Sequence, residues 1–292
     1  MEQQLQVFIK VAERESFSRA AEELHMTQPA VSQHISWLEQ RLGAKLLDRT
    51  NKYVRLNEAG RIVYRHALEM RGVHDRMVML LDDLQHKAQG SLHIGASYTF
   101  GEYVLPHAVS TLRTQYPLIE PTIYIGNTKE IADKVSVHQL DIGIVEGKVE
   151  HPHIRMDEVG EDEMVVIVGR NHKLDNHTPV KPEALNEETW IVREPGSGTR
   201  SALDRFFLEH RLQPKQLMQF GSTQIIKESV EAGLGITLMS RWAIRKELSL
   251  GTLKVLQIEG TPVLRQFYSI THAATTPTKA MKVFLKLLKG EE

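Results

Sequence analysis

Two short amphipathic helical patterns follow each other closely in residues 16–43, "SFSRAAEELHMTQPAVSQHISWLEQRLG", with a break at residues 25–28. Ala21 and Val31 stand ten positions apart, as the close crossing of two helices in a helix-turn-helix requires. His25 occupies the turn and tolerates a left-handed backbone better than most residues other than glycine. A further helical pattern at residues 2–15 completes a three-helix core. The spacing predicts a helix-turn-helix domain.

The second helix of this pair begins with polar side chains, which a helix built only for packing does not need. A recognition helix enters the major groove by its N-terminal end, where glutamine can form paired hydrogen bonds with adenine. The basic segment 49–57, "RTNKYVRLN", predicts a hairpin wing whose cations hold phosphates. The candidate DNA-binding residues are Thr27, Gln28, Pro29, Ser32 and Gln33 on the helix, and Arg49, Lys52 and Arg55 on the wing.

The charge distribution supports a polyanionic partner. The chain of 292 residues has a net charge of −1, yet seven Lys or Arg residues and only two acidic ones lie between positions 41 and 65. A basic block in a neutral chain is typical of nucleic-acid binding. Taken singly, each candidate is also explained by a capped helix end or an exposed charged loop. Their combination with the three-helix pattern favours double-stranded DNA.

Residues 58–89 are predicted to form one long helix, capped by Asn57. Its apolar positions repeat at alternating spacings of four and three, as in a coiled-coil seam. We expect self-association through this seam, because no apolar companion helix lies next to it in sequence; packing on its own domain is the alternative. "QGSL" at 89–92 predicts a hinge. The seam consists of Val63, Ala67, Met70, His74, Met77, Leu81, Leu84 and Ala88.

Beyond the hinge, segments typical of strands alternate with segments typical of helices. This alternation predicts parallel sheets covered by helices, and hence an α/β receptor or enzyme. Helices are expected at 101–115, 128–138, 200–211, 224–232 and 277–289. Strands are expected at "LHIGAS", "PTIYIG", "LDIGIVEG", "EMVVIVG", "TWIVREP", "GITLMS", "LKVLQI" and "QFYSITHA".

Several functional classes lack their sequence signals. There is no cysteine, which excludes disulfides, thiolate nucleophiles and cysteine-based zinc sites. No export signal and no apolar run of membrane-spanning length is found, so we expect a cytoplasmic protein without membrane contact. The histidines at 151, 153, 172 and 177 have no carboxylate at ligand spacing. We therefore predict no metal, no cofactor and no catalytic residues. An enzyme or a solute-binding component built on the C-terminal region is the alternative.

"FSRAAEELHMTQPAVSQHISWLEQRLGAKLLDRT", the long helix and the α/β region together resemble LysR-type transcriptional regulators over essentially the full length. The resemblance implies a multidomain α/β protein: a winged helix-turn-helix at 1–58, a linker and dimerisation helix at 59–89, and an effector-binding domain at 90–292. The effector domain would have two subdomains like those of periplasmic binding proteins, about 91–161 with 267–292 and about 162–266. A homodimer or homotetramer is implied, with RNA polymerase as a candidate partner. Leu47 replaces a common Phe, and Asn57 a common Thr.

An effector in such a domain is expected between the subdomains, at strand C-termini and helix N-termini. Four junctions there offer hydroxyl or amide donors beside unpaired backbone N–H groups, which favours a small anion. Plain helix capping, with Glu194 paired to an arginine, is the alternative. The candidate effector residues are Ser97, Thr99, Asn127, Thr128, Arg193, Ser197, Gly198, Thr199, Arg200, Thr223 and Gln224.

The segments "REPGSGTR", "GSTQ" and "EAGLGI" are similar to the CysL-like subgroup of the family, which is associated with sulfur assimilation. The similarity suggests a role in sulfur or amino-acid metabolism. Glycines 196 and 198 would let the backbone approach the ligand closely. We expect Thr99→Ala and Thr199→Ala to abolish the response to the effector and to leave DNA affinity intact.

Overall fold

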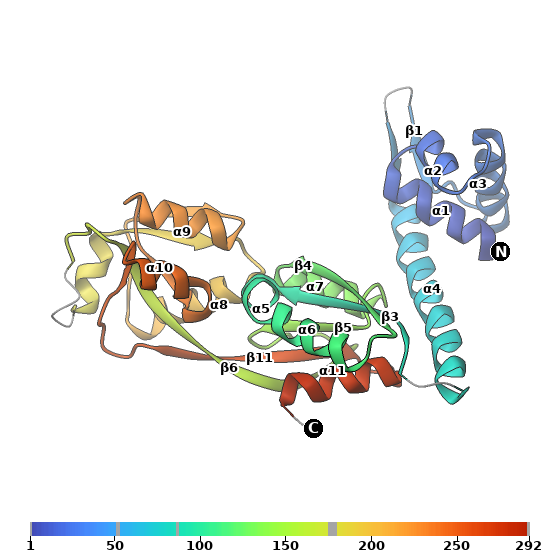
Figure 1. The fold of residues 1–292 in the computed structure, drawn as a ribbon. Coiled ribbons are helices and arrows are strands. Elements are labelled where there is room, and N and C mark those ends of the chain that lie inside the picture. Colours follow the sequence, from blue (N-terminus) through green and yellow to red (C-terminus); the bar gives the residue numbers. More distant parts are fainter. Residues whose placement is uncertain (1, 51–52, 86–87, 175–179, 291–292) are drawn as a thin grey trace. The chain divides into compact units, whose positions relative to one another are not determined.

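The computed structural model describes residues 2–50, 53–85, 88–174 and 180–290. The chain divides into two compact units, one formed by residues 1–82 with 137–139 and the other by residues 83–136 with 140–292. Figure 1 shows three short helices, a hairpin and a long helix in the first unit, and a mixed sheet with flanking helices in the second. We call them the N-terminal unit and the effector unit.

Three helices surround the core of the N-terminal unit: α1 (Glu2–Arg14), α2 (Phe17–Glu23) and α3 (Gln28–Leu42). Ser16 caps α2 and Thr27 caps α3, because each hydroxyl accepts a hydrogen bond from a backbone N–H group of the first turn. His25 has a φ of 52° in the turn between them, which confirms its left-handed backbone. The core contains Val7, Phe8, Val11, Ala20, Ala21, Val31, Ile35, Leu38, Leu46 and Leu47.

The predicted wing is an antiparallel hairpin of β1 (Leu47–Arg49) and β2 (Val54–Leu56). Lys52, one of the candidate phosphate contacts, lies outside the described residues. After the hairpin, α4 runs from Glu58 to Gln85. The backbone N–H of Gly60 donates to the Asn57 side chain at 2.8 Å, which confirms the predicted cap.

The first half of α4 packs on α1, where Ala67 and Leu68 form a buried cluster with Ile9. The alternative of packing on its own domain therefore holds for this first half, and the companion helix is distant in sequence. Further along, Met70, Met77 and Leu81 are each more than half exposed. The end of α4 at Gln85 precedes the predicted end. Gly90 already begins a strand, so residues 90–92 are not a hinge loop.

One seven-stranded sheet runs through the effector unit in the order β10-β6-β11-β5-β3-β4, with β9 also paired to β6. The strand β3 (Gly90–Ser97) pairs in parallel with β4 (Ile119–Gly126) on one side and with β5 (Ile142–Glu146) on the other. The others pair antiparallel: β6 (Ile154–Gly169), β9 (Thr237–Ser240), β10 (Leu253–Val255) and β11 (Val263–His272). The prediction of parallel sheets was therefore only partly right.

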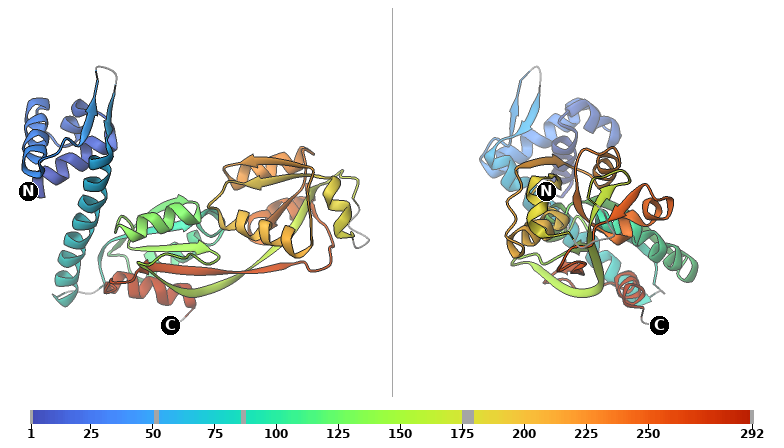
Figure 2. Two further views of the ribbon diagram at one scale, coloured as in Figure 1. Left: turned by 180° about the vertical axis from the view of Figure 1, so that it is seen from behind. Right: turned by 90° about the vertical axis from the view of Figure 1, so that its left-hand side faces the viewer.

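The two long strands β6 and β11 run side by side through the effector unit (Figure 2). They contribute to two separate hydrophobic cores. The first part of β6 and the end of β11 contribute to a core with β3 and β5, together with α6 (Leu105–Gln115), α7 (Thr128–Ser136) and α11 (Lys279–Lys289). The second part of β6 lies in a core with β7 (Thr189–Arg193), α8 (Gly198–Glu209) and α9 (Thr223–Glu231). We call these the first and second halves.

Several elements differ from the predicted pattern. The helix expected at 101–115 is two helices, α5 (Tyr98–Tyr103) and α6, because the backbone breaks at Val104 before Pro106. The strand β8 (Gln216–Phe220) was missed; it is parallel to β7 at an exposed edge and lacks a continuous apolar run. The short helix α10 (Arg245–Leu250) has no buried residue, and the 3₁₀ turns at Pro182–Glu187 and Arg241–Ile244 were also missed.

None of the helices in the described part of the chain combines the length and the apolar character needed to cross a lipid bilayer.

Candidate DNA-binding surface and effector site

The N-terminal end of α3 presents its polar side chains to solvent. Thr27, Gln28, Pro29 and Gln33 are exposed, and Ser32 is half-buried. Thr27 accepts a hydrogen bond from the Ala30 N–H, so its hydroxyl already serves as the helix cap. The Gln28 amide donates to the Ser32 hydroxyl at 3.2 Å. This bond stays on the helix surface and can be exchanged for a bond to a base edge without exposing buried groups.

A buried glutamate connects α3 with the wing. Glu39 is 4% exposed and accepts hydrogen bonds from the Leu46 N–H at 3.0 Å and the Lys45 ammonium at 2.8 Å. Burial alone would raise the pKa of Glu39, but these donors and the nearby Arg49 hold it below its usual value. Arg49 also lies over the Phe17 ring at 4.6 Å. Of the predicted wing cations, Arg49 is thus partly engaged within the protein.

Arg55 is the wing cation best placed for an outside partner. It is exposed, and its guanidinium stacks over the Tyr53 ring at 5.1 Å. Its backbone pairs with Asp48 across the hairpin. An exposed cation on a strand of a hairpin is suited to a phosphate contact.

The effector candidates in "REPGSGTR" are engaged in contacts within the protein. Arg193 donates to the carboxylate of Glu194 at 2.7 and 2.8 Å and to Thr223 at 3.4 Å, and lies over the Tyr98 ring at 4.4 Å. Arg200 pairs with Asp204 at 2.8 Å. The plain alternative, in which Glu194 pairs with an arginine, is what the structure contains. Both guanidiniums thus pair with carboxylates of the protein.

The outer candidates behave similarly. Asn127 caps α7, since its side-chain oxygen accepts from the Glu130 N–H at 2.9 Å, and its amide donates to Glu194 at 3.3 Å. The Gln224 amide donates to Glu228 at 2.7 Å. Ser197 is buried at the first turn of α8. The side-chain amides of Asn127 and Gln224 are thus engaged with neighbouring residues of the protein.

The remaining hydroxyl candidates surround a carboxylate that the sequence analysis missed. Glu146 ends β5 and is 3% exposed. One of its oxygens accepts from the Ser97 hydroxyl at 3.0 Å and the Thr99 N–H at 2.9 Å, and the other from the Thr199 hydroxyl at 3.2 Å. Thr128 donates to the Glu146 carbonyl at 3.4 Å. The donors predicted for an effector anion therefore hold an anion of the protein itself.

Gly198 permits this arrangement by close approach. A Cβ atom at Gly198 would lie 2.3 Å from the backbone oxygen of Glu146, which is far inside van der Waals contact. The glycine thus lets the start of α8 approach the end of β5 closely. Four residues donate hydrogen bonds to the Glu146 carboxylate, and we call them the carboxylate cradle: Ser97, Thr99, Thr199 and Arg265.

Arg265 completes the cradle from β11. Its guanidinium donates to Glu146 at 2.8 Å and to Asp162 at 2.7 Å, and it is 7% exposed. The Ser240 hydroxyl also donates to Asp162, at 2.6 Å. Burial opposes the charge of Glu146, yet Arg265 and the hydroxyl and backbone donors lower its pKa. Burial raises the pKa of Asp162, against the pull of Arg265.

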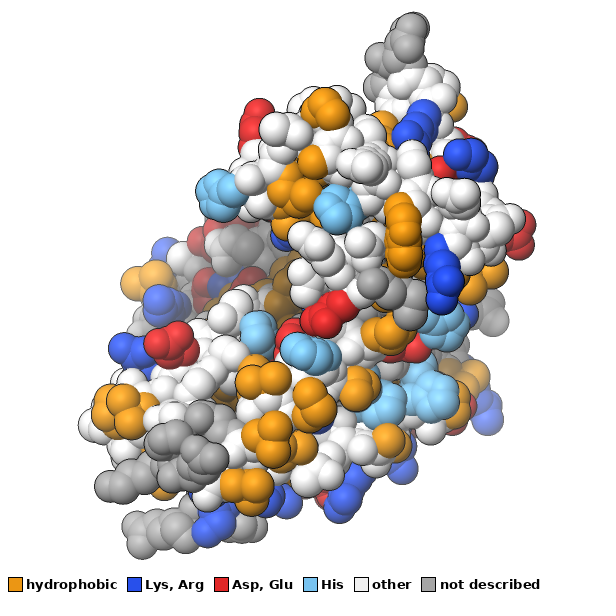
Figure 3. All heavy atoms as spheres, turned by 90° about the vertical axis from the view of Figure 1, so that its right-hand side faces the viewer, with side chains coloured by type: hydrophobic (Ala, Val, Ile, Leu, Met, Phe, Trp, Pro, Cys, Tyr) orange, Lys and Arg blue, Asp and Glu red, His pale blue; other side chains and the backbone are white. Residues whose placement is uncertain are grey.

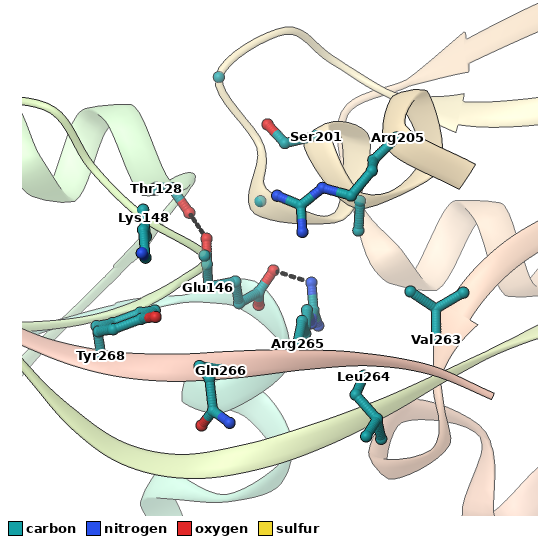
Figure 4. A pocket seen from close by; sticks show the side chains of 14 residues that line it. Thr128, Glu146, Lys148, Ser201, Arg205, Val263, Leu264, Arg265, Gln266 and Tyr268 are labelled. Atoms are coloured by element: carbon teal, nitrogen blue, oxygen red, sulfur yellow. Dashed lines mark hydrogen bonds and ion pairs between the residues drawn. The ribbon is translucent and has the colours of Figure 1, made fainter. Parts of the chain in front are cut away.

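A cavity of about 370 Å³ adjoins the Glu146–Arg265 pair between the two halves of the effector unit (Figure 4). Thr128, Lys148 and Tyr268 line it from the first half, and Ser201 and Arg205 from α8 in the second. Its size is that of a small-metabolite site. No group of three or more potential metal-ligating side chains is found among the described residues.

Sequence reasoning missed Glu146, Asp162, Arg265 and the cavity cations. The available signal was weak: Glu146 is an acid that directly follows the apolar run "IGIV", and Arg265 interrupts the alternation of β11. Their pairing joins residues 119 positions apart and depends on the sheet order, which the strand pattern does not contain.

Two family models match the chain. "Bacterial regulatory helix-turn-helix protein, lysR family" matches residues 3–61, and "LysR substrate binding domain" matches residues 85–292. The regulator CysL of Bacillus subtilis is 34% identical over 286 residues, covering 98% of this chain and 96% of the relative. A RuBisCO operon transcriptional regulator of Acidithiobacillus ferrooxidans is 32% identical over 285 residues, covering 98% and 92%.

Solved structures share the fold. A full-length OxyR variant from Pseudomonas aeruginosa superposes with a TM-score of 0.76 at 22% identity, over 99% of this chain and 94% of that one. The CcmR regulatory domain of Synechocystis, solved in complex with 2-PG, has a TM-score of 0.65 at 28% identity, over 69% and 97%. These matches confirm the predicted winged helix-turn-helix and two-part α/β architecture. The chain belongs to the LysR family of DNA-binding transcriptional regulators.

Proposed function

We propose that this regulator reads double-stranded promoter DNA through the exposed N-terminal end of α3, with Gln28 and Gln33 at base edges and the wing at phosphates. The observation that supports this most directly is the row of solvent-facing polar side chains at that end of the helix, which Thr27 caps. Arg55 supplies sequence-independent affinity from the wing. The DNA-binding part corresponds to residues 1–58.

We further propose that a small anionic metabolite acts as the effector and binds to residues 90–292, between the two halves. The cavity beside Glu146 and Arg265 offers the space. The relative CcmR, solved with 2-PG, supports an anion as the ligand class. The similarity to CysL favours sulfur or amino-acid metabolism, while the RuBisCO operon regulator offers carbon metabolism as the second candidate.

The proposal includes assembly and location. The exposed seam of α4 supports a homodimer, and a homotetramer follows if the effector units also associate. RNA polymerase is the candidate partner at the promoter, and the cytoplasm is the compartment in which the protein meets both. An effector changes transcription only if it binds one arrangement of the two halves more tightly than another.

The test uses the full chain and a duplex from the region upstream of its own coding sequence. Fluorescence anisotropy at several salt concentrations should give at least about a thousandfold preference over a scrambled duplex, the lower limit for specific regulators. Equal affinity for both duplexes would refute sequence-specific reading. A thermal-shift series with sulfate, phosphate and small carboxylates then tests the effector class, since ligand at 100 times its dissociation constant adds about 2.7 kcal/mol of stability.

A further inference from the structure

The hydrogen-bond donors of the carboxylate cradle are already used by Glu146. Each oxygen of Glu146 accepts two hydrogen bonds, one from Ser97 and one from the Thr99 N–H on one side, and one each from Thr199 and Arg265 on the other. Since Glu146 and Asp162 flank a single guanidinium, the buried cluster already carries more negative than positive groups. A ligand anion at the cradle would be repelled unless Glu146 left it.

The adjoining cavity has the opposite character. Lys148 follows β5 in the first half, and Arg205 lies on α8 in the second; both side chains line the cavity. Neither has an ion pair with any described residue, in contrast to Arg193, Arg200 and Arg265. Within the described lining, Glu146 is the sole carboxylate, and it pairs with Arg265. The two remaining cations give the cavity a net positive charge.

The position of these cations in the cavity fits a bridging ligand. In Figure 4 the Arg205 guanidinium extends from α8 toward the middle of the cavity, while Lys148 lies on the opposite side, close to Glu146 in the chain. Tyr268 on β11 lines the same cavity. Ser201 adds a hydroxyl one turn before Arg205.

We propose that the ligand of this chain is a small dianion whose two anionic groups pair with Lys148 and Arg205 in the cavity, while Glu146 stays in the cradle. The inference rests on the proposed function and specifies its effector site. Binding joins a cation of the first half to a cation of the second and so stabilises one arrangement of the halves. A planar guanidinium suits a carboxylate, phosphate or sulfonate group, and the ammonium a second such group.

The experiment is isothermal titration calorimetry on the full chain with sodium malonate, phosphate and sulfate, and with acetate as a monoanion. We expect malonate, which carries two anionic groups, to bind at least about tenfold more tightly than acetate, since a hydrogen bond to a charged group contributes about that factor. Arg205→Met and Lys148→Met should each lower the affinity for that probe by at least about tenfold. Arg205→Lys, which keeps the charge but lacks the planar guanidinium, should weaken binding less than Arg205→Met does.

Arg113→Met is the matched control, because Arg113 is an exposed arginine of α6 that does not line the cavity. It should leave affinity within about twofold. Unchanged binding in both cavity variants would overturn the inference but leave an anionic effector in place. Loss of binding in Thr199→Ala, with full binding in Arg205→Met, would also overturn it and assign the anion to the cradle. No binding of any divalent probe to the unaltered chain would overturn both the inference and the anionic effector.

Discussion

The guanidinium of Arg265 donates to the carboxylate of Glu146 at 2.8 Å, and both side chains are less than a tenth exposed. The pair joins β11 to β5 at the level where α8 approaches, so it fixes elements from both halves of the effector unit. Asp162 on β6 shares the same guanidinium at 2.7 Å. One arginine thus pairs with two buried acids.

Removing this arginine should destabilise the effector unit strongly. Arg265→Ala leaves Glu146 and Asp162 buried without their cation, a situation that costs about 3–5 kcal/mol. For a unit of this size, the thermal midpoint should fall by about 2–4 °C for each kcal/mol. Differential scanning calorimetry of the full chain measures it. Arg113→Ala should leave the midpoint almost unchanged, and an equally stable Arg265→Ala variant would show that the ion pair contributes nothing.

The Glu146 carboxylate should make the effector unit sensitive to acid. Its folded pKa is lowered below the unfolded value of 4.5, so its stabilising effect is complete above that value and is lost as the pH falls through the lower folded pKa. In Glu146→Gln the group does not titrate. We therefore expect a lower midpoint than in the unaltered chain at pH 7, and a smaller further loss between pH 5 and pH 3, by calorimetry. Parallel losses in both proteins would contradict this assignment.

How far the sequence could lead differs between the two units. The N-terminal unit was predictable almost residue by residue, because its caps, turn and helical spacing are local: Thr27, His25 and Asn57 act on residues within three positions. In the effector unit, the strand and helix alternation was predictable, but the crossing strands β6 and β11 and their antiparallel pairing were not. Hydroxyl groups such as Thr99 and Thr199 were correctly located near one another. Their partner, Glu146, depends on contacts between distant segments.

Gln28 and Gln33 should determine base preference rather than overall affinity. Gln28→Ala or Gln33→Ala removes a side chain that can pair with a base edge, and each good pair is worth about 1–3 kcal/mol of discrimination. Specific binding should weaken about 5- to 150-fold, with binding to scrambled DNA unchanged. Competition anisotropy with both duplexes measures the ratio. Gln40→Ala, at the exposed far end of the same helix, is the control and should have no effect.

Arg55 should contribute affinity without sequence preference. An exposed wing cation that neutralises one phosphate releases counterions. Arg55→Ala should therefore lower the affinity for specific and scrambled duplexes by the same factor. The slope of log affinity against log salt concentration should become shallower by about 1. A titration between about 50 and 200 mM salt measures this slope. If only the specific duplex were affected, Arg55 would be a base contact instead.

Self-association should depend on the exposed seam of α4. Leu81 is 57% exposed and lies on the same side of the helix as Met70 and Met77, which are 53% and 52% exposed. Figure 3 shows in orange the hydrophobic side chains that reach the surface on one face of the molecule. A segment of residues 1–89 keeps the N-terminal core intact and isolates this seam from the effector unit. We expect it to be a dimer at tens of micromolar by sedimentation velocity.

Leu81→Lys in the same segment should raise the dissociation constant of that dimer at least about tenfold, because the dimer would bury an unpaired charge. Asp75→Lys introduces the same side chain at an exposed position on a different side of α4 and should leave the dimer nearly intact. A monomeric unaltered segment would show that α4 does not associate through this seam. Equal weakening by both substitutions would point to a general charge effect, since only Leu81 lies in the predicted heptad positions.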